Sequence, residues 1–197
     1  MRARGKETRQ AILQAAEAIF AERGYAGARM DDVAAEVGIK RASMVYYFRD
    51  KHSLYVALLQ DLYGELLEQY RHRLDAGGTA RDRILEILKV WTDHVVARPG
   101  SVRILMWESA RVRRSASESV AGEMAPIQNA LSELLEEGRR QGMFRSIQPL
   151  RFLMIVTGAT AFLTLGMDAL TRQPSSLTAE ELHAELRSLV ERILFVD

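Results

Sequence analysis

The sequence predicts an all-α protein, and two observations lead to that prediction. Apolar residues recur at intervals of three and four along most of the 197 residues, which places them on single faces of helices. In the C-terminal half, no stretch of convincing length alternates with the period of two that marks a β-strand, so no sheet is expected. The composition, with 48% hydrophobic and 27% charged residues, is ordinary for a soluble globular chain.

Composition and charge restrict the possible functions. The absence of cysteine excludes disulfides and thiol chemistry, and it fits a reducing cytoplasm, where we expect the protein to act. The first ten residues are charged and lack the following apolar core of a signal peptide. Residues 1–60 hold ten Lys/Arg against seven Asp/Glu, whereas the rest of the chain holds seventeen against nineteen. The basic excess is modest, so a DNA partner would need specific geometry more than bulk attraction.

The chain begins with a basic segment and one predicted helix. The segment contains Arg2, Arg4, Lys6 and Arg9, and it is either a frayed, solvated terminus or an arm that contacts DNA. The helix ends at Gly24, and its apolar face consists of Ile12, Leu13, Ala16, Ile19 and Phe20. This helix would pack beneath the next two, because short helices depend on tertiary packing for their stability.

Residues 29–38 predict the first helix of a helix-turn-helix. Its inner face would be formed by Met30, Val33, Ala34 and Val37. Asp31 and Asp32 lie in the first turn, where carboxylates complement the exposed backbone amides. Gly38 ends the helix, because glycine adopts the left-handed conformation that other residues avoid.

A second helix is predicted for residues 43–48, after a turn at residues 39–41. Its buried side would be Met44, Tyr47 and Phe48. The opposite side offers hydrogen-bond donors to phosphates or base edges, namely Lys40, Arg41, Ser43 and Tyr46. The second helix of a helix-turn-helix enters the major groove of DNA, so this polar face is the predicted reading face.

The next helix is predicted to start with an anion site. Asp50 is placed to cap its first turn, and Lys51 would add a cation beside the positive end of the helix dipole. Such a site suits a DNA phosphate.

These residues together resemble the TetR family of bacterial transcriptional regulators. The shared pattern comprises Ala34, Ala35, Gly38, Ile39, Tyr46, Tyr47, Phe48, Lys51 and Leu54. The resemblance is close over residues 6–66, and beyond them it covers only length and helix order. It implies a three-helix DNA-binding domain at residues 1–50 and a helical effector-binding and dimerisation domain at residues 51–197. A long connecting helix would open the second domain.

Three residues depart from the family pattern. Arg29 replaces a threonine, so a helix cap is missing and a cation takes its place. Lys40 replaces a serine in the turn. Val45 replaces a tyrosine that commonly holds a phosphate, so either one backbone contact is lost or Tyr46, Lys40 and Arg29 compensate.

The remaining chain predicts further helices. The connecting helix should run from Asp50 to about Leu74, roughly 35 Å at about 1.5 Å per residue. Thr79 is a predicted N-cap after two glycines, and a kink or a late helix start is expected at Pro126. Residues 152–167 are uncharged and apolar, but they fall short of the ~20 residues that span a membrane. We therefore expect a buried or interface helix there, followed by a last helix from Thr178.

The resemblance implies two further sites in the second domain. Candidate walls of a pocket for an apolar or aromatic effector are Trp91, His94, Met106, Trp107, Met124 and Phe162, although residues of these types are more often plain core than pocket wall. The family dimerises through its last two helices, and the corresponding residues are Gly158, Ala161, Leu165, Leu182, Leu186, Leu189 and Ile193. Without a partner chain, these helices would pack inside one subunit instead.

The sequence thus predicts a homodimeric, sequence-specific DNA-binding regulator, in the form of a repressor released from a palindromic operator by a small molecule. Lys51, Tyr47 and the basic arm are assigned to phosphates; Lys40, Arg41, Ser43 and Tyr46 to base edges or nearby backbone; Arg29 to either. No enzyme, metal or cofactor is expected, because the four histidines form no metal-binding motif. The alternative is a helical protein-interaction module with a residual helix-turn-helix.

Overall fold

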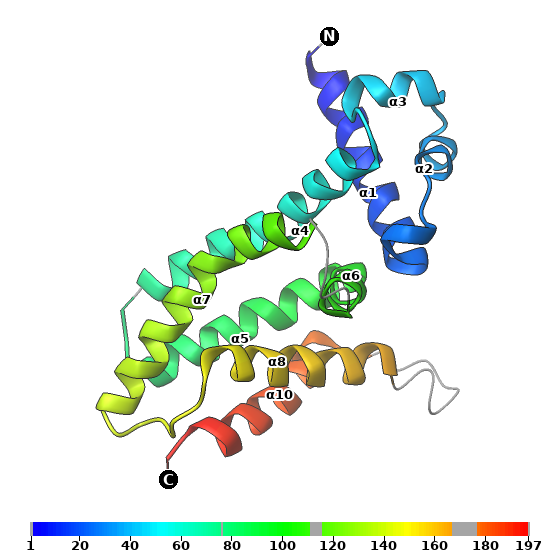
Figure 1. Ribbon diagram of the computed structural model, residues 1–197. Helices are drawn as coiled ribbons and strands as arrows, with labels where there is room; N and C mark the ends of the chain where they lie inside the picture. The colour runs from blue at the N-terminus through cyan, green and yellow to red at the C-terminus, as the bar shows by residue number, and fades with distance from the viewer. Residues whose placement is uncertain (1, 76, 111–115, 167–176, 197) are drawn as a thin grey trace. The chain divides into compact units, whose positions relative to one another are not determined.

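The computed structural model of the chain describes residues 2–75, 77–110, 116–166 and 177–196, which are helical apart from short connections (Figure 1). The helices are α1 (Arg2–Gly27), α2 (Met30–Val37), α3 (Arg41–Tyr47), α4 (Lys51–Asp75), α5 (Ala80–Ala97), α6 (Pro99–Ala110), α7 (Ala116–Arg140), α8 (Pro149–Ala161), the π-helix η1 (Phe162–Gly166) and α10 (Ala179–Leu194). Within the described ranges, the only β-type pairing recorded is an isolated antiparallel bridge between Phe144 and Phe195. The all-α prediction is confirmed.

The chain divides into two compact units. Residues 1–64 and 103–123 form the first unit, and residues 65–102 and 124–197 form the second. The division runs through α4 and α6, so the first part of α4 packs with the helix-turn-helix. A boundary drawn at residue 50 cuts that packing unit, because the core residues Leu54, Tyr55 and Leu58 lie beyond it.

The first unit is built on α1, which packs against α2, while α2 packs against α3 (Figure 1). Gly24 has φ 63° and ψ 175°, so the regular helix is broken there as the sequence predicted. The aromatic rings of Phe20, Tyr25 and Tyr55 meet behind this break with centroids 4.8–6.0 Å apart. The aromatic cluster therefore joins α1 to the start of α4.

The turn between α2 and α3 has the geometry that the sequence predicted. Gly38 adopts the left-handed conformation, with φ 73° and ψ 27°. Its N–H donates to the carbonyl of Ala35, and the N–H of Ile39 donates to the carbonyl of Ala34. This pair of hydrogen bonds is a Schellman motif, which satisfies the last carbonyls of α2 and sets the direction of the chain into α3.

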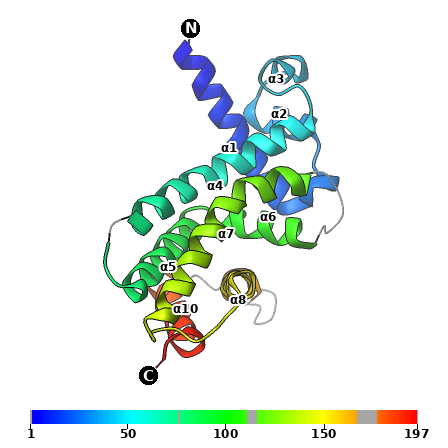
Figure 2. The same cartoon turned by 60° about the vertical axis from the view of Figure 1, so that its left-hand side comes forward.

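The second unit has α10 packed against both α5 and α8 (Figure 2). Capping boxes open two of these helices: Thr79 and Asp82 at α5, and Thr178 and Glu181 at α10. The indole of Trp91 on α5 donates to the hydroxyl of Thr160 on α8 at 2.9 Å. None of the described helices is long and apolar enough to cross a bilayer.

The apolar stripe of α10 is packed within the chain. Leu182 and Leu186 were assigned to a dimer seam, but both side chains are fully buried within this single chain. They face the helices that α10 covers in its own chain. The periodic stripe was real, and the chain itself covers it.

The end of α10 and the residues after it are hydrogen-bonded to the connection between α7 and α8. The N–H of Arg145 donates to the carbonyl of Leu194, and the N–H of Val196 donates to that of Met143. The rings of Phe144 and Phe195 stack with centroids 5.5 Å apart. Gly138 lies directly beneath Phe144, where a Cβ would come within 2.6 Å of the ring carbon Cγ.

We predict that Gly138→Ala destabilises the protein. Alanine normally favours a helix interior, but here the added methyl overlaps a buried ring, and overpacking costs about 1–3 kcal/mol. The matched control is Gly64→Ala in α4, where nothing lies within 4 Å of the added carbon. That change should stabilise by about 0.5–1 kcal/mol. Denaturant unfolding of both variants measures the two effects, and a stabilised Gly138→Ala variant would contradict the packing described.

Candidate functional site

The α3 helix presents the exposed polar face that the sequence predicted. It begins at Arg41, two residues earlier than expected, because the carbonyl of Lys40 accepts from the N–H groups of Ser43 and Met44. Met44 and Phe48 are buried, whereas Tyr47 is only half-buried. Tyr46 is 88% exposed and meets the Tyr47 ring edge-on at 5.5 Å. Lys40, Arg41 and Ser43 are exposed as well.

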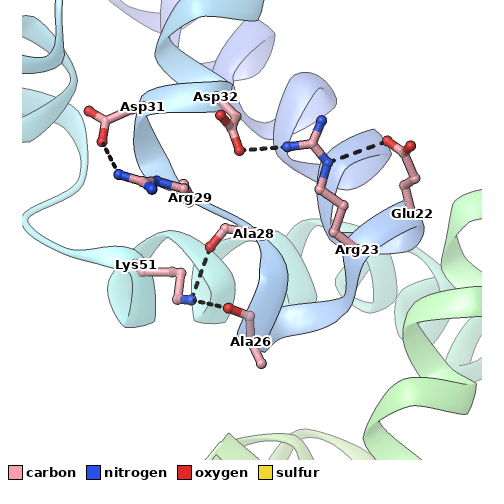
Figure 3. A network of polar contacts seen from close by, with 8 residues as sticks. All are labelled: Glu22, Arg23, Ala26, Ala28, Arg29, Asp31, Asp32 and Lys51. Atoms are coloured by element: carbon pink, nitrogen blue, oxygen red, sulfur yellow. Dashed lines mark hydrogen bonds and ion pairs between the residues drawn. The ribbon is translucent and has the colours of Figure 1, made fainter.

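Charged side chains gather at the start of α2, beside α3 (Figure 3). Asp31 has its two carboxylate oxygens near different cations, with Oδ2 3.9 Å from Nη2 of Arg29 and Oδ1 3.6 Å from Nε of Arg41. Arg29 occupies the N-cap position of α2 without a side-chain cap, as the sequence predicted. The site therefore carries a carboxylate between two of its expected DNA-contacting cations.

The neighbouring Asp32 has a different partner. Its Oδ2 lies 2.6 Å from Nη1 of Arg23, which ties α2 to the end of α1 (Figure 3). Nε of Arg23 also lies 3.7 Å from the carboxylate of Glu22. The two consecutive carboxylates thus point to different groups: Asp32 joins two helices of the scaffold, and Asp31 joins the two exposed arginines.

Lys51 is engaged differently from the sequence prediction, which assigned it to a DNA phosphate. Its ammonium donates to the carbonyl of Tyr25 at 2.7 Å. It also donates to the carbonyl of Ala28 at 3.0 Å and lies 3.4 Å from that of Ala26 (Figure 3). The Tyr25 ring lies beneath the ammonium, 4.6 Å from its centroid. An ammonium has three donors, and each has a carbonyl within reach. We therefore interpret Lys51 as the group that holds α4 to the connection between α1 and α2.

The start of α4 is fixed a second time by Asp50. The N–H of Ser53 donates to Oδ1 of Asp50 at 2.7 Å, and the N–H of Asp50 donates to the Ser53 hydroxyl at 3.1 Å. The first of these hydrogen bonds is the main reason that the pKa of Asp50 lies below its usual value. Asp50 is therefore the N-cap that the sequence predicted.

The sequence did not predict a contact between α1 and the end of α3, where the guanidinium of Arg9 lies 5.2 Å from the centroid of the Phe48 ring.

The basic segment at the N-terminus is helical and forms the first turns of α1. The sequence had placed Arg9 in an arm ahead of the helix, whereas the structure places it on α1 above the end of α3. No glycine or proline lies between residues 6 and 23 to break the helix. The helical spacing between Arg9 and the apolar residues of α1 was the sequence feature that could have shown that Arg9 belongs to this helix.

Two of the six expected effector contacts lie together in the second unit. Trp91 and His94 on α5 stack with centroids 6.2 Å apart. Burial of the imidazole, with a smaller contribution from the positive charge of Arg98, lowers the pKa of His94 to about 4. The imidazole is therefore neutral at pH 7, and a neutral imidazole has one donor and one acceptor nitrogen. Trp91 is buried, and its N–H already has Thr160 as an acceptor.

The other four expected contacts are described separately from this pair. Met106 and Trp107 belong to the first unit. The Trp107 indole lies over Gly24 of α1, and its N–H donates to the carbonyl of Ala21 at 3.3 Å. Phe162 is 70% exposed, and the side chain of Met124 lies outside the described residues. Trp107 therefore contacts α1 within the first unit, and its helical spacing in the sequence could not reveal this contact.

The face of α8 turned away from the core is apolar. Met154 is 65% exposed, Leu150 and Ile155 are exposed on the same helix and Phe162 at the start of η1, and Arg151 is an exposed charged side chain among them. Of the predicted interface residues, Gly158, Leu165, Leu189 and Ile193 are half-buried, whereas Ala161 is buried in the chain. Leu150 and Met154 were missed, although their spacing of four to each other and to Gly158 was the signal that marked this face.

We predict that Lys51→Met destabilises the first unit, because it leaves the carbonyls around the ammonium without a donor. Lost hydrogen bonds to a charged group typically cost about 1–3 kcal/mol. The control is Lys40→Met, because Lys40 is exposed and makes no side-chain cap. Its unfolding free energy should stay within about 0.5 kcal/mol of the parent. Denaturant titration followed by circular dichroism separates the two; equal stability of Lys51→Met and Lys40→Met would favour the phosphate role.

Family comparisons agree with this geometry. Residues 12–58 match the model of the bacterial regulatory proteins of the tetR family, and residues 81–193 match the tetracyclin repressor-like C-terminal domain. The HTH-type transcriptional repressor NicS of Pseudomonas putida is 26% identical over 144 residues, which are 70% of this chain and 66% of that protein.

Two solved structures share the fold. The ketosteroid transcriptional regulator KstR2 of Mycobacterium tuberculosis superposes with a TM-score of 0.74 at 19% identity, over 96% of this chain and 95% of the other. FadR of Bacillus subtilis, solved with stearoyl-CoA, gives 0.70 at 18% identity over 92% and 95%. The two family models together span both units of the chain, including the turn at Gly38 and the exposed face of α3. The protein therefore belongs to the TetR family of bacterial regulatory proteins, and it is a DNA-binding transcriptional regulator.

Proposed function

We propose that this regulator is a homodimeric repressor that leaves a palindromic operator when a small molecule binds its second unit. The observation that carries this proposal is the exposed face of α3, which rests on the buried side chains of Met44 and Phe48. A rigid helix with one buried and one polar exposed face is the arrangement that reads the major groove.

The exposed donors divide into two kinds. Arg41 and Ser43 lie on α3 and Lys40 occupies the position before it, so these three, with Tyr46, are our candidates for base edges or the adjacent backbone. Half-buried Tyr47 and the cations of the first turns of α1 are assigned to phosphates. Arg29 stays a candidate for either role, with its guanidinium 3.9 Å from Oδ2 of Asp31. Lys51 stays outside this set, because its donors are directed to backbone carbonyls.

The exposed face of α8 supports a dimer. Solvent-exposed apolar side chains that cluster on one helix mark an interaction surface. A second copy is the occupant we propose, because a two-fold dimer presents two α3 helices to successive major grooves about 34 Å apart. The surface that carries the dimer is then Leu150, Met154, Gly158 and Phe162, together with the outer side of α10.

The effector is expected near Trp91 and His94. KstR2 is described as a ketosteroid transcriptional regulator. FadR was solved in complex with stearoyl-CoA, so the fold accommodates a large ligand with an apolar part in that protein. For this chain we propose an apolar or aromatic molecule with a polar group that meets neutral His94. Such a ligand releases DNA only if it binds more tightly to the conformation that does not fit the operator.

A gel-shift experiment tests the DNA-binding role in this form. The protein should give a salt-sensitive, sequence-selective complex with the DNA upstream of its own reading frame. Arg41→Ala should weaken that complex by about 1–3 kcal/mol and relax the preference at one base position. An equal loss on every sequence would assign Arg41 to phosphate, and a wild-type protein without any selective complex would refute the proposal.

A charge placed on the α8 face should abolish the dimer. Met154→Glu buries a carboxylate in an apolar contact, where a charge without a partner costs several kcal/mol. Ser146→Glu is the control, since it adds the same charge to an exposed loop position of the same unit. Light scattering should give twice 22.2 kDa for the parent and the control, and 22.2 kDa for Met154→Glu. A monomeric parent would remove the dimer from the proposal.

A further inference from the structure

Asp31 stands out on the DNA-facing surface because its charge opposes that of DNA. The side chain is 58% exposed at the first turn of α2, and its carboxylate lies 3.9 Å from Arg29 (Figure 3). The other carboxylate oxygen lies 3.6 Å from Arg41. A carboxylate here reduces the attraction of the surface for every phosphate. Residues 1–60 have an excess of only three positive charges, so one acidic residue is a large part of the balance.

The structure of α2 alone does not require Asp31. A carboxylate in the first turn stabilises a helix, but Asp32 supplies one at the adjacent position. Asp32 also forms the closer ion pair, 2.6 Å from Arg23, and connects α2 to α1. Asp32 therefore makes the structural contribution that is expected of this acidic pair. The helix itself gives no separate reason for a carboxylate at Asp31.

The contact with Arg41 has a geometry that suits positioning. Oδ1 of Asp31 approaches Nε, the guanidinium nitrogen nearest the side-chain stem, at 3.6 Å. The nearest guanidinium nitrogen is therefore Nε and not either of the two terminal NH2 groups, whose parallel donors match the O6 and N7 acceptors of guanine. Asp31 thus restrains the guanidinium from α2 while its outer edge stays available to a base.

We propose that Asp31 is a specificity-determining residue, which positions Arg41 for a base edge and lowers the affinity of Arg29 and Arg41 for DNA of any sequence. This inference rests on the proposed function, in which Arg41 reads a base. Surface ion pairs contribute little to folding, so the role is in DNA selection and not in stability. The residue acts through Arg41 and is a positioning residue in that sense.

The test compares two affinities of the full-length protein. One duplex is the sequence that the wild-type protein enriches from a random pool, and the other is the unselected pool itself. Asp31→Asn should bind the unselected pool about three- to tenfold more tightly at moderate salt. The ratio of selected to unselected affinity should fall about tenfold, because Arg41 loses its restraint. Circular dichroism and thermal unfolding should show that the variant remains folded.

Two further variants decide between this role and its competitors. Asp32→Asn removes the same charge from the next residue and should leave the ratio within about twofold of wild type. In an Arg41→Ala background, Asp31→Asn should no longer change the ratio, since a positioning residue acts only through the group it positions. Equal effects of Asp31→Asn and Asp32→Asn would show that only the total charge of this surface matters, and that result would overturn the inference.

The remaining outcomes are equally decisive. An unchanged ratio in Asp31→Asn overturns the inference while leaving the regulator intact, as does a ratio that still falls in the Arg41→Ala background. Loss of both affinities with a lower melting temperature would make Asp31 a structural residue. A wild-type protein that enriches no sequence would instead refute the proposed function itself, so the two failures are distinguishable.

Discussion

The ammonium group of Lys51 holds the start of α4 to the connection between α1 and α2, and the DNA-binding unit depends on this contact. Its carbonyl acceptors belong to Tyr25, Ala26 and Ala28, on both sides of the point where α1 gives way to α2. These carbonyls lie next to the break at Gly24, where regular helical hydrogen bonds end. A single flexible cation satisfies them, and Asp50 and Ser53 fix the helix from which it extends.

The reading surface is built on that scaffold with little spare charge. Gly38 sets the angle between α2 and α3, Met44 anchors α3, and the donors of α3 are left exposed. Arg29 and Arg41 face a common carboxylate, so the cations of this surface are partly neutralised before any DNA arrives. A regulator must prefer one site among a large excess of other DNA, and a surface with muted charge serves that need better than a strongly basic one.

Two helices of the second unit have apolar faces, one buried and one exposed. The apolar stripe of α10 is covered by α5 and α8 of its own chain, with Leu182 and Leu186 at its centre. The apolar face of α8 around Met154 has no such cover within the described part of the chain. The buried hydrogen bond from Trp91 to Thr160 fixes α8 against α5, so the exposed face has a defined orientation.

The sequence by itself determined the features that are local. Helical periodicity, the left-handed glycine at position 38 and the cap at Thr79 each depend on residues a few positions apart, and all three were predicted. Tertiary structure alone decided which partner each side chain has. Lys51 found carbonyls 23 to 26 residues away, Trp107 lies on Gly24, and the α10 stripe faces inward. Spacing along a helix defines a face, whereas what covers that face depends on contacts between segments that are distant in the sequence.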